Sequence, residues 1–399
     1  MAKFLNSEQI NFVKEHITDD TANLALIKNK LNVEDVESVI NDISCRQKLI
    51  KKFPEWATNF DLTMPFGINI EQSSSRETAR FKASIFNYSN SLDLTSGFGI
   101  DTYFLALKSE NHIAVEKNFS LCRVLVNNLK NLHINNTIVL SNTAEEFLER
   151  NTIKYDLVYL DPSRRINQKR KIFDYEDYEP NLNIIFSKIR LITRYLLVKL
   201  SPMLDISFVK NKFPDCSDIY ILSIDGEVKE LLLAFDFLKH SISTQIHAVE
   251  LGDNKFQHFF DDDEELDINF GMPEQYIYDI HPAIKKTGYS EHYADSLGLA
   301  KISFASNIYT SNEFVGNFCG KVYRLISVVK PDSKEIQKVL PEMKAIVVKN
   351  GFNLSVDDIR KKYKILEGDE KVIFAVKLLS GKSSFLITEK INNYPNIIS

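Results

Sequence analysis

Polar residues stand directly after four short apolar runs in the first half of the chain. Asp93 closes the run SLD, Glu116 follows HIAV, Asn142 and Thr143 follow TIVL, and Asp161 follows DLVYL. Carboxylates at strand ends can accept hydrogen bonds from sugar hydroxyls or amino groups, and an amide can bind the edge of a base. The recurring pattern predicts one site for a nucleotide-like ligand at the ends of four consecutive strands.

The segment DLTSGFGID predicts a tight loop between the first of these strands and a helix. Gly97 and Gly99 let the backbone approach a ligand closely, and the helix that opens near Asp101 leaves N–H groups free at its start. The chain lacks the third glycine of a dinucleotide fingerprint and the GK[ST] of a P-loop. Glu116 stands about 20 residues further on, where a carboxylate can bind both hydroxyls of a ribose.

The elements that must position these residues follow from the apolar periodicity. Residues 1–60 carry apolar side chains near helical spacing and predict helices. From residue 90, short apolar runs alternate with stretches long enough for helices, which is typical of βαβ units and a mainly parallel sheet. The runs DIYILSID and ELLLAFDF, joined by the short GEVK, predict antiparallel edge strands. The predicted fold class is α/β, with a Rossmann-like sheet, N-terminal helices and a small C-terminal α+β domain.

These motifs resemble those of the class I S-adenosylmethionine-dependent methyltransferases. DLTSGFGIDTYFLA is similar to their first motif, Glu116 to the acid that binds the ribose, SNTAEE to the adenine-side motif, and DPSRR to the fourth motif. The resemblance also implies that Gln72 covers the methionine end of the cofactor. It implies S-adenosylmethionine as the cofactor, held by Gln72, Asp93, Thr95, Gly97, Gly99, Asp101, Glu116, Asn142 and Thr143.

The fourth motif bears on the reaction. In amino-group methyltransferases its pattern is [DNS]-P-P-[FYW], in which the acid and the first proline's carbonyl accept the hydrogens of the amine and the aromatic ring stacks on the base. Asp161 and Pro162 match this pattern and are the predicted catalytic residues. Ser163 replaces the second proline and Arg164 stands where the ring would be, so this motif has no aromatic residue to stack on the base. An Arg guanidinium can instead stack on a base or hold a phosphate.

A cluster of cations follows the fourth motif. The stretch SRRINQKRK, from Ser163 to Lys171, contains five Lys and Arg residues. Beside a methyl donor these cations would favour a polyanion such as RNA. The sequence is equally compatible with a mobile, solvated loop that binds no substrate. The predicted substrate-binding residues are Ser163, Arg164, Arg165 and Lys171.

The charge of the chain is unevenly distributed. The net charge is −5, from 49 Lys and Arg against 54 Asp and Glu, but residues 321–390 carry 15 basic and 9 acidic residues, a net of +6. A basic appendage on an acidic body is a hint of anion binding. More narrowly, the sequence resembles bacterial methyltransferases with a ferredoxin-like insert and a C-terminal THUMP-like domain. The resemblance implies a helical region at 1–60, a methyltransferase domain at 61–270, a small ferredoxin-like segment at 271–320 and a THUMP-like α+β domain at 321–399.

Together these features predict a methyltransferase that acts on a base nitrogen in RNA, either tRNA or rRNA. Two alternatives stay open: methylation of a protein or small-molecule amine, and a non-catalytic RNA-binding protein on a methyltransferase scaffold, for which Ser163 and Arg164 are the best argument.

Composition restricts the location and the partners. No run reaches the ~18 apolar residues of a membrane span and the start is polar, so we expect a cytoplasmic protein without a membrane partner. Neither His nor Cys residues occur in a metal-ligand spacing, so we expect no metal. The sequence does not predict the oligomeric state.

Overall fold

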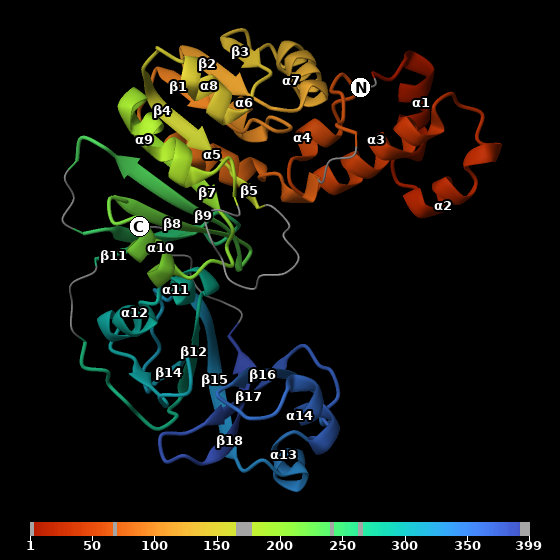
Figure 1. Ribbon diagram of the computed structural model, residues 1–399. Coiled ribbons are helices and arrows are strands. Elements are labelled where there is room, and N and C mark those ends of the chain that lie inside the picture. The colour runs from red at the N-terminus through yellow and green to blue at the C-terminus, as the bar shows by residue number, and fades with distance from the viewer. Residues whose placement is uncertain (1–3, 67–69, 165–177, 240–242, 262–265, 392–399) are drawn as a thin grey trace. The chain divides into compact units, whose positions relative to one another are not determined.

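The chain forms two compact units in the computed structural model (Figure 1). The structure describes residues 4–66, 70–164, 178–239, 243–261 and 266–391. Unit 1 comprises Met1–Leu222 and Glu230–Thr244, and unit 2 comprises Ser223–Lys229 and Gln245–Ser399. None of the described helices is both long enough and apolar enough to cross a membrane.

Short helices open unit 1, as their periodicity predicts. They are α1 (Ser7–His16), α2 (Thr21–Leu26), α3 (Val36–Leu49) and α4 (Pro54–Ala57), with the 3-10 turn η1 (Lys28–Lys30). Asn6 begins α1 with a capping box, because its side chain accepts from the N–H of Gln9 and the Gln9 side chain accepts in return. Val13 of α1 packs with Val39 and Ile43 of α3 in a small apolar core.

Buried Arg46 joins α3 to the chain that follows α4. Its side chain is 2% exposed and forms an ion pair with Asp42. Its guanidinium also donates to the carbonyls of Ala57 (3.0 Å), Asn59 (2.9 Å) and Leu62 (2.7 Å). One side chain thus satisfies a carboxylate and three backbone oxygens, which fixes the path of the chain towards the sheet.

The sheet of unit 1 has the order β8-β9-β7-β4-β1-β2-β3. Strands β3, β2, β1, β4 and β7 run parallel to their neighbours, and β9 pairs with β7 in the antiparallel sense. This confirms the predicted parallel sheet with an antiparallel strand at one side. The strands are β1 (Asn90–Asp93), β2 (Asn111–Val115), β3 (Thr137–Leu140), β4 (Tyr155–Leu160), β7 (Thr193–Leu200), β8 (Asp218–Ile224) and β9 (Glu227–Asp236).

The helices of unit 1 alternate with these strands (Figure 1). Since the five parallel strands share one direction, their carboxyl ends lie along one edge, and the chain order reverses direction between β1 and β4. Ligands bind at such a switch point in open α/β sheets. The helices are α5 (Arg76–Ser84), α6 (Ile100–Lys108), α7 (Phe119–Asn131), α8 (Ala144–Arg150), α9 (Leu182–Ile192) and α10 (Ile206–Lys212), and the 3-10 turn η2 (Ile70–Gln72) precedes α5.

Unit 2 contains a seven-stranded sheet of order β13-β14-β12-β15-β18-β17-β16. Its strands are β12 (Tyr276–Ile280), β13 (Ala300–Lys301), β14 (Ile308–Ser311), β15 (Gly320–Val329), β16 (Ile346–Asn350), β17 (Lys371–Lys377) and β18 (Ser383–Lys390). The helices are α11 (Pro282–Thr287), α12 (Ser290–Ser296), α13 (Ser333–Val339) and α14 (Val356–Tyr363), and β10 (Gln245–Glu250) pairs with β11 (Phe256–Phe260). Because β12 pairs with β15, residues before and after 320 share one sheet.

We predict that Arg46→Met destabilises unit 1 by about 3–5 kcal/mol, because the carboxylate of Asp42 and three carbonyl oxygens would stay buried without their donor. Trp56 is the only tryptophan and lies in α4, so its fluorescence during urea denaturation measures the change. Arg190→Met is the control, since that side chain is 49% exposed and its ion pair should contribute about 1 kcal/mol or less. Equal losses in the two variants would contradict the prediction.

Candidate active site at the strand ends

The glycine loop after β1 has a backbone that only glycine adopts readily. Gly97 has φ +54° and Gly99 has φ +99°. A Cβ at Gly99 would lie 2.3 Å from Cδ1 of Leu125. Gly99 is also the N-cap of α6, and no described side chain caps that helix start. The first N–H groups of α6 are therefore available to a ligand, as the sequence predicts.

The loop is held against the N-terminal helices by aromatic packing. Phe98 and Ile100, on either side of Gly99, share an apolar cluster with Trp56. The rings of Trp56 and Phe98 meet edge to face at 5.6 Å between centroids. The helical region thus supports the loop that the cofactor prediction depends on.

Asp93 lies at the end of β1, and its carboxylate is completely buried. One oxygen accepts from the N–H of Thr95 (2.9 Å) and the other from the hydroxyl of Thr102 (2.6 Å). Burial raises the pKa of Asp93 to about 7, against the effect of these two hydrogen bonds. Asp93 therefore shapes the glycine loop and the start of α6, and any effect on a ligand passes through them.

Glu116 lies directly after β2 and faces the same loop. Its Oε2 accepts from the N–H of Gly97 (3.0 Å) and its Oε1 from the N–H of Asn118 (2.7 Å). Each carboxylate oxygen has a further lone pair, so the fixed carboxylate can still accept from two ribose hydroxyls. The structure brings Glu116 to the glycine loop as the resemblance implies.

Asn142 and Thr143 follow β3, next to the Glu116 segment. The N–H of Glu116 donates to the carbonyl of Leu140 (3.1 Å), which places the ends of β2 and β3 side by side. The Thr143 hydroxyl caps α8, because it accepts from the N–H of Glu146 (3.2 Å). Its hydroxyl is thus used within the fold, and Asn142 is half-buried at the same edge.

Asp161 and Pro162 come directly after β4, adjacent to β1. The N–H of Asp161 donates to the hydroxyl of Thr95 (2.6 Å), so the fourth motif is hydrogen-bonded to the first. Oδ2 of Asp161 pairs with Nζ of Lys199 on β7 at 2.6 Å, and about a third of its side chain remains exposed. Pro162 is buried. A partly exposed acceptor therefore stands beside the glycine loop.

Behind this edge lies a buried charge cluster that the sequence analysis missed. Lys82 of α5 is 1% exposed, and its Nζ lies 2.7 Å from Oδ1 of Asp101 and 2.9 Å from Oε2 of Glu230 on β9. The hydroxyl of Ser74 accepts from Lys82 (2.6 Å) and donates to Asp101 (2.7 Å). Asp101 is thus tied into the protein, whereas the resemblance assigns it to the cofactor.

Lys199 extends this cluster to Asp161. Its Nζ lies 3.4 Å from the Ser74 hydroxyl, so Ser74 contacts both lysines. Tyr159 donates to Asp101 (2.9 Å), and Thr78 donates to Glu230 (2.9 Å). We call the five charged residues Lys82, Asp101, Asp161, Lys199 and Glu230 the charge cluster.

The protonation states within the charge cluster follow from burial and pairing. Burial opposes the charge of Lys199, but Asp161, Glu230 and Asp101 outweigh it and raise its pKa. Burial also opposes the charge of Asp101, and the two lysines outweigh it and lower its pKa. For Asp161, burial raises the pKa and the neighbouring Lys199 offsets part of that rise. Lys199 is therefore an ammonium at neutral pH and cannot serve as a base.

The remaining predicted residues lie at or beyond the limit of the described chain. Ser163 and Arg164 form the short strand β5 (Ser163–Arg164), antiparallel to β6 (Tyr178–Glu179). The backbone of Gln72 ends the turn η2. The side chains of Arg164 and Gln72, and the whole of Arg165 and Lys171, lie outside the described residues.

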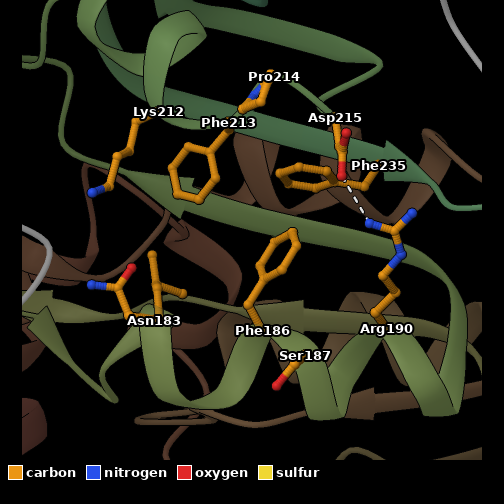
Figure 2. Close-up of a pocket in the computed structure, with 10 residues that line it drawn as sticks. Asn183, Phe186, Ser187, Arg190, Lys212, Phe213, Pro214, Asp215 and Phe235 are labelled. Carbon is orange, nitrogen blue, oxygen red and sulfur yellow. Dashed lines mark hydrogen bonds and ion pairs between the residues drawn. The ribbon is translucent and has the colours of Figure 1, made fainter.

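A cavity of about 390 Å³ lies away from this edge, between α9, residues 212–215 and β9 (Figure 2). The rings of Phe186, Phe213 and Phe235 face one another there, and Arg190 pairs with Asp215 at 2.8 Å on one side. None of the predicted site residues lines it. Among all the described residues, no group of three or more His, Cys, Asp or Glu side chains could hold a metal ion.

Comparison with known proteins supports the fold. Residues 320–390 match the model of the THUMP domain-like family. A proposed methyltransferase from Porphyromonas gingivalis W83 has a crystal structure that matches with a TM-score of 0.84 and 26% identity, over 98% of this chain and 100% of that one. These findings confirm the resemblance to class I methyltransferases with a THUMP-like C-terminal domain. A comparison with the curated proteins found no match.

Two further structures match only part of the chain. An rRNA methylase from Streptococcus thermophilus matches at 16% identity and a TM-score of 0.30, over 39% of this chain and 92% of that one. TrmK from M. capricolum, in complex with S-adenosyl-homocysteine, matches at 10% identity and a TM-score of 0.32, over 41% of this chain and 68% of that one. At these scores neither bears on the function of this chain.

We predict that Asp93→Asn removes a pH-dependent contribution to the free energy of unfolding of unit 1. The carboxyl of Asp93 holds its proton more tightly in the folded state, so the free energy of unfolding of the wild type, relative to the variant, should fall as the pH rises from about 4 to about 7. The fall should total about 4 kcal/mol and then level off.

Urea denaturation of both proteins from pH 3.5 to 8, followed by Trp56 fluorescence, measures this difference. The comparison cancels the titration of all groups that the two proteins share. A difference that does not change with pH would contradict the raised pKa of Asp93.

Proposed function

We propose that the protein, a methyltransferase by its fold and its full-length match, transfers the methyl group of S-adenosylmethionine to a nitrogen of an RNA base. The observation that carries this proposal is the hydrogen bond from the N–H of Asp161 to Thr95. It joins the partly exposed carboxylate of Asp161 to the glycine loop, so the group that would orient the methyl acceptor stands beside the loop that would hold the methyl donor.

The residues at the strand ends suit this cofactor. The backbone at Gly99 leaves no room for a side chain, and the start of α6 offers N–H groups to a carboxylate. Glu116 would accept hydrogen bonds from the ribose hydroxyls, and Asn142 would bind the adenine. When bound, the cofactor supplies a methyl group already activated by a positive sulfonium, so the protein mainly needs to position the acceptor and exclude water.

Asp161 would accept a hydrogen bond from the acceptor nitrogen, with the Pro162 carbonyl as the second acceptor. Holding both hydrogens in the plane of these oxygens leaves the nitrogen lone pair directed away from them, towards the methyl group. Ser163 and Arg164 replace the proline and aromatic residue of the family pattern, so the base would be held by other groups, such as a guanidinium stacked on its face.

The RNA part of the proposal rests on the C-terminal region. The THUMP-like match covers residues 320–390, and residues 321–390 carry a net charge of +6 within a protein of net charge −5. Cations that neutralise phosphates favour nucleic acid over a neutral amine. The five cations of residues 163–171, which follow the fourth motif in the sequence, would add a second contact.

We predict that the protein transfers labelled methyl groups from S-adenosylmethionine to total RNA of a strain that lacks it, with the label lost after ribonuclease treatment. Nucleoside mass spectrometry of that strain would then name the missing methylated base. Label that survives the nuclease would contradict an RNA acceptor and favour a protein or small-molecule amine. Absence of cofactor binding in calorimetry would favour the non-catalytic scaffold.

We predict that Asp161→Ala lowers turnover by about 100-fold or more, because the acceptor nitrogen loses its orienting carboxylate, while the affinity for S-adenosylmethionine changes by no more than a few-fold. Calorimetry and single-turnover methylation measure the two effects. Asp215→Ala is the control, since this exposed carboxylate of the same unit pairs only with the surface residue Arg190 among the described residues. A matching loss of cofactor affinity would contradict the role given to Asp161.

A further inference from the structure

Lys199 is an unusual residue for its position. It lies in the middle of the sheet on β7, in the apolar run YLLVKL, and only 11% of its side chain is exposed. The pairing of Leu160 on β4 with Val198 on β7 sets Lys199 beside Asp161. A lysine in such a position needs a partner for its charge, and Nζ lies 2.6 Å from Oδ2 of Asp161.

The two lysines of the charge cluster have different partners. Lys82 contacts Asp101 and Glu230, both of which lie deeper in the protein, with side chains 12% and 6% exposed. Lys199 instead contacts Asp161, whose side chain is 34% exposed. Lys82 therefore stabilises the interior, whereas Lys199 acts on the one member of the cluster that a substrate could reach.

The two oxygens of Asp161 also differ. Oδ2 is held by Lys199, whereas no described residue donates a hydrogen bond to Oδ1. A carboxylate with one oxygen fixed by an ammonium has its plane fixed as well, because the remaining rotation would break the ion pair. The second oxygen then keeps a constant direction towards the exposed side.

We propose that Lys199 is the positioning residue of the methyl-transfer site, which holds Oδ2 of Asp161 so that Oδ1 accepts a hydrogen bond from the acceptor nitrogen. This inference rests on the proposed function. Lys199 also favours the ionised form of Asp161 against the effect of burial, since loss of a neighbouring ammonium raises the pKa of a carboxyl by about one to three units. Lys199 acts through Asp161 and takes no proton from the substrate.

Several charged or titratable groups surround Asp161, and its ionisation depends on all of them. Lys199 is the nearest, and the others come from α5, α6, β1, β4 and β9. Lys82, Asp101, Asp93 and Tyr159 act on Asp161 directly, and Glu230 acts on it through the two lysines. Lys199→Gln is the most selective change, because the amide can still donate to Oδ2 but carries no charge.

The test compares Lys199→Gln, Lys199→Arg and the control Lys188→Gln, which removes a surface lysine of α9 that pairs loosely with Glu149 at 3.6 Å. Each is measured for cofactor affinity by calorimetry, for kcat and KM of RNA methylation from pH 5 to 9, and for the pKa of Asp161 by carbon NMR of Asp-labelled protein. Trp56 fluorescence verifies that each variant is folded.

For Lys199→Gln we expect a 10- to 100-fold lower kcat, an unchanged KM for RNA, cofactor affinity within a few-fold, and an acid limb of kcat moved up by about one to three pH units together with the pKa of Asp161. Lys199→Arg should restore the position of the acid limb, and Lys188→Gln should match the wild type. An unmoved Asp161 pKa, or an acid limb that stays in place, would overturn the inference.

The NMR measurement separates this inference from the proposed function. If the wild type methylates no RNA, the proposed function fails, yet the Asp161 pKa still reports whether Lys199 controls that carboxyl. If RNA is methylated and Lys199→Gln leaves both the pKa and kcat unchanged, the proposed function stands and Lys199 is only a structural residue.

Discussion

The arrangement of the strand ends depends on the buried contacts of Lys82. Its ammonium joins Asp101 at the start of α6 to Glu230 on β9, and the Ser74 hydroxyl connects it to Lys199. Two ammonium groups face three carboxylates here, so the cluster has one negative charge in excess. Removing a single partner would leave a buried charge uncompensated, which is far more destabilising than replacing the whole cluster by apolar residues. Several mutually dependent buried contacts therefore hold the geometry beside the glycine loop.

The charge cluster restrains the residue that would orient the methyl acceptor. Asp161 is restrained through its backbone by Thr95 and through its side chain by Lys199. Thr95 in turn donates its N–H to Asp93, which is fixed by Thr102. Loop and acceptor thus belong to one hydrogen-bonded chain, and the pairing of β2 with β3 connects the polar residues after β3 to it. A substitution that changes the ligand preference would therefore disturb the fold less at Asn142 than at Thr95.

Much of the fold and part of the site were predictable from local patterns. Strand ends, glycines at positive φ and a carboxylate after β2 leave signals within a few residues, and the structure brings Glu116 and Asp161 to the glycine loop accordingly. Lys82, Lys199 and Glu230 were missed, because their contacts join segments far apart in the sequence. A signal existed: Lys199 interrupts the apolar run YLLVKL, Glu230 directly precedes the apolar run LLLAF within β9, and a charge inside a central strand requires a buried partner. Which residue becomes that partner depends on the tertiary structure, and the apolar periodicity of the sequence does not reveal it.

The distance along the chain between the parts of the charge cluster also affects how the protein is made. Thr78 and Glu230 are 152 residues apart, so at ~5–20 residues per second the ribosome needs roughly 8–30 s to supply β9 after α5 has been synthesised. During that interval Lys82 and Asp101 can pair, but the third member of their contact does not yet exist. The glycine loop and its support from Trp56 can form first. The proposed catalytic edge is thus completed only after β9 has been synthesised, when this antiparallel strand pairs with β7.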